Sequence, residues 1–314
     1  AAGEKSFSLM HRILCLAMQG KISYQQQRPY QGQQAKADMT QVDSSSNVQA
    51  PSGGMRLPAR RKMASARSVM ALILREMSTS YGRSPGGYIW TIIEPIGGIV
   101  MLSIVFSFLL RSPPLGSSFL LFYATGMVPF LAYGGVSGKI AGAIKFSKPL
   151  LAYPSVTYVD ALVARLILET MTQLIVGFIL MTGIIIWAGS PISLDCTAIS
   201  LACAMALALA VGVGLTNSFL NSMFPVWTSL WSVLTRPLFL ISGIFFLIDP
   251  LPEQYRTIVL YNPLVHIISM MRSGFYATYD ATYASPTYVF AFSIIPAFFG
   301  MLMLHRYHKD ILEL

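Results

Sequence analysis

Residues 139–165 read K-I-A-G-A-I-K-F-S-K-P-L-L-A-Y-P-S-V-T-Y-V-D-A-L-V-A-R, and this stretch decides how the chain is arranged. Its lysines, Lys139, Lys145 and Lys148, lie between two long apolar runs. In membrane proteins, short loops rich in Lys and Arg stay on the cytoplasmic side. We therefore expect this loop to face the cytoplasm and to fix the orientation of the apolar segments that flank it.

The composition is that of an integral membrane protein. Of 314 residues, 54% are hydrophobic and only 11% are charged, whereas soluble domains carry about a quarter charged residues. A helix that crosses a bilayer needs about twenty apolar residues. We therefore predict an all-α integral membrane protein with six transmembrane helices, at residues 88–110, 119–140, 158–188, 194–220, 226–248 and 288–304.

The segment between the fifth and sixth predicted spans, residues 249–286, has a different character. It carries charged residues and many tyrosines, with one apolar helix-like piece at residues 263–276. That piece is short for a span, and counting it as a seventh would place the basic C-terminus outside. We predict a re-entrant or periplasmic helical hairpin, which is tolerated where protein or a water-filled cavity covers the backbone.

Two N-terminal parts precede the first span. Residues 1–59 are rich in Gln, Ser and Gly, and such a polar composition cannot bury enough apolar surface to fold, so we predict a disordered tail. Residues 60–86 contain apolar positions at helical spacing from Val69 to Met77, with charged residues on the other face, and then a linker. We expect this amphipathic helix to lie in the membrane interface.

Positive charge gathers at the N-terminus. Residues 1–67 hold ten Lys or Arg against three acidic residues, within a formal net charge of +9. A basic tail could bind nucleic acid, but beside membrane spans it favours a cytoplasmic face near anionic lipid, so we expect no nucleic-acid partner. With six spans, this tail, the loop at 139–165 and the basic C-terminus share one side. Both termini are therefore predicted to be cytoplasmic.

The three cysteines, Cys15, Cys196 and Cys203, show no metal-ligand spacing. Cys196 and Cys203 lie seven residues apart in one apolar segment, where they could not form a normal disulfide. We interpret them as small apolar fillers and expect no metal site. No nucleophile or acid–base carboxylate pair is visible either, so no catalytic residue is predicted.

Two motifs are specific enough to indicate a family. The first span is entered through S-x-G-G-Y-I-W-T-I-I-E-P, at residues 84–95, and the outer segment contains Y-N-P-L-V-H-I-I-S-M-M-R-S-G-F-Y, at residues 261–276. With an interfacial helix before six spans, the chain resembles the membrane subunits of type-2 ABC exporters, and among them the capsular polysaccharide and O-antigen permeases. The resemblance covers residues 60–314, of which 87–314 would be the ABC-2 type transmembrane domain.

The resemblance implies a half-transporter in the bacterial inner membrane. Two copies would form a homodimeric channel for a lipid-linked polysaccharide, with two ABC ATPase subunits docked beneath and a periplasmic co-polymerase or adaptor as a further partner. The sequence contains no G-x-x-x-x-G-K-[ST] phosphate loop. We therefore predict a permease without its own ATPase site or cofactor, whose ATP and Mg²⁺ are bound by the partner.

The basic loop would then be the ATPase-coupling loop, with Lys145, Lys148, Pro149, Tyr153 and Pro154 as its contact residues. The alternative is a plain loop that only sets topology. In the same way, the resemblance makes the outer hairpin a periplasmic gate, with Tyr255, Tyr261, His266, Arg272 and Tyr276 as candidates. A lone histidine at such a place is more often a hydrogen-bonded structural residue than a ligand.

Charges inside spans are costly and mark either a pathway or an ion pair. Glu94 and Arg236 lie in the first and fifth spans, each followed by a proline. In the family that the chain resembles these two spans line the conduit, so the resemblance implies that both residues lie there and that Arg236 meets an anionic sugar or lipid phosphate. The alternative is a structural ion pair of Arg236 with Glu94 or Glu169. Arg165 and Glu169, four residues apart on the third span, are expected to pair with each other.

Aromatic side chains offer broad apolar faces on which sugars can stack. The conduit candidates of this kind are Tyr88, Trp90, Trp227 and Trp231. The alternative is an interfacial belt, since Trp and Tyr gather at headgroup level in membrane proteins generally.

Three other functions are alternatives to this interpretation. A type-2 ABC exporter of drugs or lipids shares the same sequence features. An ion-coupled secondary transporter predicts internal repeats with broken helices at matching places, and none is visible. A membrane-embedded transferase requires an acidic catalytic cluster at the end of a span, which is also not visible.

Overall fold

The computed structural model describes residues 64–80, 87–151, 156–188 and 194–313, and these form helices joined by turns, without a strand. The described residues all belong to one unit, Arg60–Leu314. The predicted tail at 1–59 and the linker at 81–86 lie outside the described residues.

Five helices of the described chain are long and apolar enough to cross a membrane. These are α4 (Gly87–Leu109), α5 (Phe119–Ala141), α7 (Tyr158–Ala188), α8 (Cys196–Met223) and α12 (Pro286–Glu313). They correspond to five of the six predicted spans, and α7 begins and ends where the sequence placed it. An all-helical protein with membrane-length helices is therefore confirmed.

The segment predicted as the fifth span forms a shorter helix, α9 (Trp227–Ile241). Gly243 has a φ of +83°, in the left-handed region that ends helices and favours glycine. The remaining residues of the predicted span, up to Ile248, form turns. At 15 residues, α9 is shorter than the roughly twenty that a span needs, so the sixth span stays a prediction.

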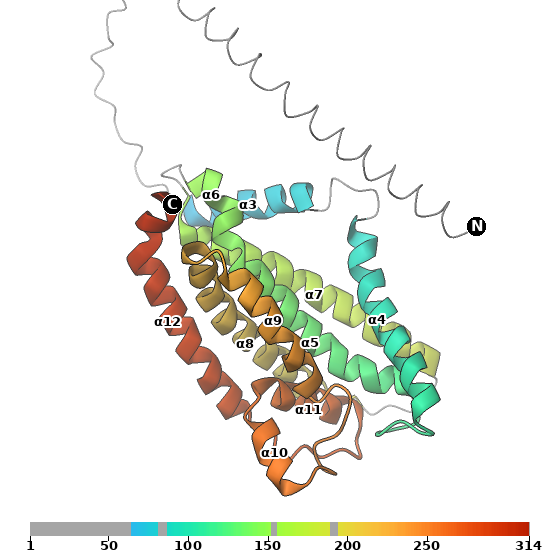
Figure 1. Cartoon of the computed structure of the whole chain (residues 1–314). Helices are drawn as coiled ribbons and strands as arrows, with labels where there is room; N and C mark the ends of the chain where they lie inside the picture. The colour runs from blue at the N-terminus through green and yellow to red at the C-terminus, as the bar shows by residue number, and fades with distance from the viewer. Residues whose placement is uncertain (1–63, 81–86, 152–155, 189–193, 314) are drawn as a thin grey trace, which may run out of the picture. The chain divides into compact units, whose positions relative to one another are not determined.

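Helix α8 lies at the centre of the bundle and packs against α12, α5 and α11 (Pro263–Phe275) (Figure 1). Its contact with α12 is a close backbone approach, because a Cβ on Gly212 would lie 2.4 Å from the carbonyl oxygen of Ser293. Small residues at helix interfaces permit such approaches in membrane proteins. Asp195 caps α8 by accepting the backbone N–H groups of Thr197 and Ala198, and these bonds lower the pKa of the Asp195 carboxyl.

Opposite ends of the bundle carry the short helices (Figure 1). Helices α3 (Ala64–Ser80) and α6 (Ala143–Leu151) lie at one end, and α10 (Glu253–Leu260) and α11 lie at the other. Helix α11 begins at Pro263 because the side chain of Asn262 accepts the N–H of Leu264 at 3.1 Å. Its apolar residues are buried against the bundle, whereas α10 buries none. The helix expected at residues 263–276 is thus present.

Candidate functional site

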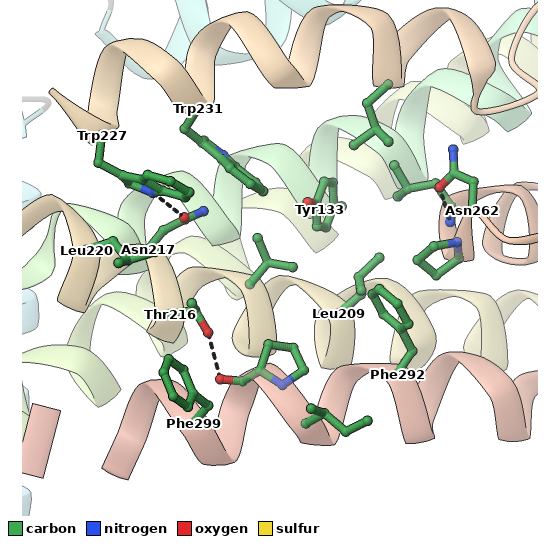
Figure 2. A pocket seen from close by; sticks show the side chains of 16 residues that line it. Tyr133, Leu209, Thr216, Asn217, Leu220, Trp227, Trp231, Asn262, Phe292 and Phe299 are labelled. Atoms are coloured by element: carbon green, nitrogen blue, oxygen red, sulfur yellow. Dashed lines mark hydrogen bonds between the residues drawn. The ribbon is translucent and has the colours of Figure 1, made fainter. Parts of the chain in front are cut away.

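A groove of about 560 Å³ lies between α8, α9 and α12, with α5 and the start of α11 at its edges (Figure 2). Trp227 and Trp231 form part of its wall from α9, with ring centroids 6.2 Å apart and planes 24° apart. They lie one helical turn apart, so the stacking follows from i, i+4 spacing. Its other aromatic walls are Tyr133, Phe292 and Phe299.

Two of the polar side chains in this groove have hydrogen-bond partners among the residues that line it. Trp227 donates its Nε1–H to Oδ1 of Asn217 at 2.8 Å, and the hydroxyl of Thr216 donates to the carbonyl of Pro296 at 2.7 Å. Figure 2 shows both bonds. No charged residue is among those that line the groove. The surface it offers is therefore aliphatic and aromatic carbon, which suits apolar groups or stacked rings.

Of the four predicted conduit aromatics, the structure brings Trp227 and Trp231 together. Trp90 lies apart from them on α4, where it is 65% exposed. The side chain of Tyr88 lies outside the described residues.

Glu94 and Arg236 are both exposed, on α4 and α9 respectively. The predicted alternative of an ion pair between Arg236 and Glu94 or Glu169 is wrong within the described part of this chain, because none of these pairs forms there. Glu169 is instead buried and accepts a hydrogen bond from Nε2 of Gln173 at 2.8 Å. Arg236 and Glu94 therefore each present a charge on an uncovered face of an apolar helix.

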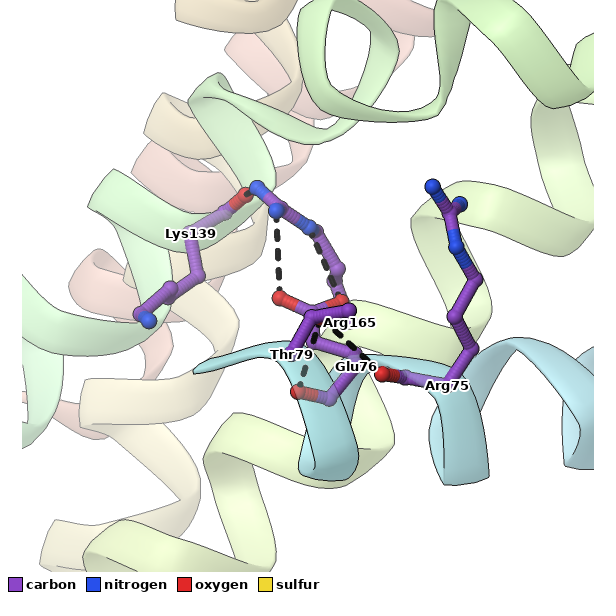
Figure 3. A network of polar contacts seen from close by, with 5 residues as sticks. All are labelled: Arg75, Glu76, Thr79, Lys139 and Arg165. Atoms are coloured by element: carbon purple, nitrogen blue, oxygen red, sulfur yellow. Dashed lines mark hydrogen bonds and ion pairs between the residues drawn. The ribbon is translucent and has the colours of Figure 1, made fainter. Parts of the chain in front are cut away.

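The expected pair between Arg165 and Glu169 is also wrong. Arg165 binds Glu76 of α3 through two contacts of 3.1 Å, from Nε to Oε2 and from Nη2 to Oε1 (Figure 3). Both side chains are buried, so Glu76 does not lie on an exposed charged face of its helix. Glu76 lies 89 positions from Arg165 in the sequence, and the fold brings its carboxylate to the guanidinium. Two parallel contacts between a guanidinium and a carboxylate are stronger than a single contact.

The predicted coupling loop contains the helix α6. Lys145, Lys148 and Pro149 are exposed on it. Tyr153 and Pro154 lie outside the described residues. The structure thus presents two cations on the outer surface of a short amphipathic helix, and the role of these residues stays a prediction.

The predicted gate residues divide into two groups. Tyr255 and Tyr261 are exposed, and His266, Arg272 and Tyr276 are buried. His266 accepts the backbone N–H of Ser285 at Nδ1, at 3.2 Å, and its Nε2 lies 2.9 Å from the carbonyl of Leu260. This arrangement makes Nε2 the donor and gives His266 the bonded, structural position that was expected of a lone histidine.

Arg272 holds the turn after α9 in place. Its Nη1 donates to the carbonyls of Gly243 and Phe246, at 2.8 and 3.1 Å, and its Nη2 donates to the carbonyl of Ile244 at 2.8 Å. The guanidinium carbon lies 4.1 Å from the ring centroid of Phe122. Sequence reasoning did not find this bonding.

Asn217 and Glu76 are the residues that sequence reasoning missed. An amide inside an apolar span is a usable signal, because polar groups there are costly unless bonded. Cys196 and Cys203 are free, and Cys15 lies outside the described residues. Within the described ranges, no group of His, Cys, Asp and Glu could hold a metal ion.

Comparison with known proteins gives consistent matches. Residues 67–276 match the ABC-2 type transporter family. The Escherichia coli polysialic acid transport protein KpsM is 30% identical over 245 residues, which span 77% of this chain and 94% of KpsM. The Neisseria meningitidis capsule polysaccharide export inner-membrane protein CtrC is 26% identical over 78% of this chain and 92% of its own length. The Haemophilus influenzae protein of the same description, BexB, is 26% identical over the same shares.

Proposed function

This chain belongs to the ABC-2 type transporter family, and from that premise we propose that it is the transmembrane subunit of an ATP-driven exporter. The cargo we propose is a lipid-linked polysaccharide of the capsular type, moved across the bacterial inner membrane. The observation that carries the proposal is the likeness to a polysaccharide transport protein at 30% identity over 94% of that protein's length.

We propose that the chain crosses the membrane six times, with α9 and the turns that follow it as the fifth passage. The basic segments, including Lys145 and Lys148 on α6, support a cytoplasmic position for α3, α6 and both termini. The helix α3 exposes Met70 and Leu74 and would lie in the cytoplasmic interface. The α10–α11 hairpin would enter the bilayer from the outer side as a periplasmic gate.

Two copies would form the conduit. Arg236 and Glu94 lie exposed on α9 and α4, and a charge facing lipid at the centre of a span costs about 2.5–3.5 kcal/mol. Contact with a second copy, or with the water of a channel, is therefore more favourable for the faces that carry Arg236 and Glu94 than contact with acyl chains. In such a dimer Arg236 would meet the anionic groups of the cargo.

The groove beside α9 fits another part of the proposed cargo. Its walls are mainly apolar and no charged residue is among those that line it, so an anionic sugar would find no charged partner there. A lipid anchor would gain from burial against Leu209, Phe292 and Phe299. Trp227 and Trp231 would supply the aromatic surface.

Energy would come from a separate ABC ATPase. The chain has no phosphate-binding loop of its own, and α6 offers an exposed cationic surface for docking. A periplasmic co-polymerase or adaptor would receive the polymer on the outer side.

Deletion of the gene in a capsulated host tests this function. We expect polysaccharide to accumulate inside the cells and to be lost from the surface, with recovery on complementation by the intact gene. Normal surface polysaccharide in the deletion strain would contradict the proposal. Unchanged polysaccharide with loss of drug or lipid efflux would instead favour the alternative cargo.

A further inference from the structure

One guanidinium joins four helices at the corner of the bundle where α6 begins. Arg165 of α7 holds Glu76 of α3 through two contacts of 3.1 Å, and its Nη1 donates to the carbonyl of Lys139 at 3.0 Å (Figure 3). Lys139 lies in the last turn of α5. We call Arg165, Glu76, the Lys139 carbonyl and Phe146 the Arg165 junction.

Phe146 brings α6 into this junction. The guanidinium carbon of Arg165 lies 4.3 Å from the centroid of the Phe146 ring, and that of Arg75, on α3, lies 5.6 Å from it. Cations over an aromatic face are attracted by its quadrupole, although the Phe146 ring is itself 38% exposed. One ring of α6 therefore receives a cation from α7 and a second from α3.

The chemistry of the junction requires arginine. The last carbonyls of a helix lack intrahelical partners and lie at the negative end of its dipole, so the Lys139 carbonyl is a good acceptor for a cation. A planar guanidinium can serve this carbonyl, a carboxylate and a ring at once, which the single ammonium of lysine cannot do. A Cβ on Gly142, where α5 breaks, would lie 3.3 Å from Nη1 of Arg165. The guanidinium thus packs against the break itself.

A second contact holds α3 to α7. Ser65 donates its hydroxyl to Asp160, and Asp160 also accepts the backbone N–H of Thr157 at 3.0 Å, within the cap of α7. Along α3, Ser65 and Glu76 are about 16 Å apart, whereas their partners on α7 are about 8 Å apart at 1.5 Å per residue. The helix α3 therefore crosses α7 at an angle and is fixed to it at two points.

We propose that Arg165 is a positioning residue that makes α3, α6, α7 and the end of α5 move as one body. This inference rests on the proposed function, in which an ATPase docks on α6. When the ATPase displaces α6, the junction transmits the displacement to α7. The chain does not bend at Gly142, between α5 and α6, so the motion is not lost there. Without the junction, ATP hydrolysis would move α6 alone.

The variants that test this proposal keep bulk and charge. Arg165→Lys retains a cation but loses the fork, and Phe146→Leu retains an apolar side chain but loses the ring. The matched controls are Arg67→Lys and Phe108→Leu, because both residues are exposed. Arg67 lies on α3 nine positions before Glu76, and Phe108 lies on α4. Spin labels at Met70→Cys on α3 and Lys148→Cys on α6, with the three native cysteines replaced, report the distance between these helices in liposomes.

We expect a single narrow distance distribution in the parent and in both controls, and a broader one in Arg165→Lys and Phe146→Leu. In the complex with the ATPase, we expect polysaccharide exported per ATP hydrolysed to fall about three- to tenfold in the junction variants, on the scale of one lost charged hydrogen bond in Arg165→Lys and one lost cation–π contact in Phe146→Leu. A merely structural role would lower the yield of folded complex and leave this ratio unchanged.

An unchanged ratio of export to hydrolysis in both junction variants overturns the proposal, whatever the distances do. Should no ATPase bind the parent chain, the proposed function fails, and the distance measurement alone decides whether Arg165 fixes α6. A distribution as narrow as the parent's in both junction variants would show that it does not.

Discussion

Trp227 donates its indole N–H to the amide oxygen of Asn217 at 2.8 Å, and this bond ties α9 to α8. The helix α9 buries none of its residues, and a second bond holds its first turn to α8, because the hydroxyl of Thr228 donates to Oδ1 of Asn221 at 3.0 Å. The same bond shapes the groove, because it fixes the indole ring beside Trp231 (Figure 2). Asn217 is thus a polar residue inside an apolar helix, and its side-chain oxygen is bonded to Trp227.

Asn217→Leu should lower stability by about 1–3 kcal/mol, because it leaves the Trp227 N–H in apolar surroundings without an acceptor. Thermal unfolding in detergent measures the effect. Adding Trp227→Phe removes the unsatisfied donor, so the double variant should be less destabilised than the sum of the two single variants. If the stability losses of the two single variants simply add in the double variant, the bond between Trp227 and Asn217 contributes no interaction energy.

Gly212→Ala should destabilise the protein by about 1–3 kcal/mol through overpacking, because its Cβ would lie 2.4 Å from the Ser293 carbonyl oxygen. Gly134→Ala is the matched control, since nothing lies within 4 Å of a Cβ built at that helical glycine. Thermal melts of the two variants side by side measure the difference. Equal melting temperatures would mean that α8 and α12 are not closely packed.

Arg236→Ala should reduce export about tenfold or more, the loss expected when a hydrogen bond to a charged group is removed, while the complex stays assembled. Surface polysaccharide measures export, and size-exclusion chromatography checks assembly. Arg236→Lys should retain part of the activity, and Arg111→Ala, in an exposed segment after α4, should retain all of it. Wild-type export by Arg236→Ala would remove this residue from the pathway.

Charge reversal at both Lys145 and Lys148 should prevent docking of the ATPase, because α6 would then present carboxylates where it now exposes cations. Co-purification of the ATPase with the tagged chain measures docking. Arg306→Glu, on the exposed end of α12, is a control for a change of charge on the same proposed side. Wild-type recovery of the ATPase with the doubly reversed chain would place the docking site elsewhere.

The membrane-length helices could be predicted because an apolar run of sufficient length specifies a span by itself, as residues 158–188 did for α7. The end of α9 could not be predicted, because Gly243 breaks the helix through a left-handed conformation and the residues that follow it, Ile244 to Ile248, are as apolar as those of a continuing span. Glycine in such a run is also compatible with a continuous membrane helix.

The ion pairs show a second limit of the sequence. Four-residue spacing favoured Glu169 as the partner of Arg165, but the folded chain brings Glu76 to the same guanidinium from 89 positions away. Local spacing carries no information about such a contact. Arg272 is similar, since its partners are backbone carbonyls after α9, which no side-chain pattern reveals.

Reconstitution of the purified chain in proteoliposomes, with and without its co-purified ATPase, tests the central claim most directly. The measurement is the amount of lipid-linked polysaccharide that crosses the membrane on addition of ATP and Mg²⁺. We predict transport only when the ATPase is present. Transport by the chain alone, or transport driven by an ion gradient without ATP, would contradict the account.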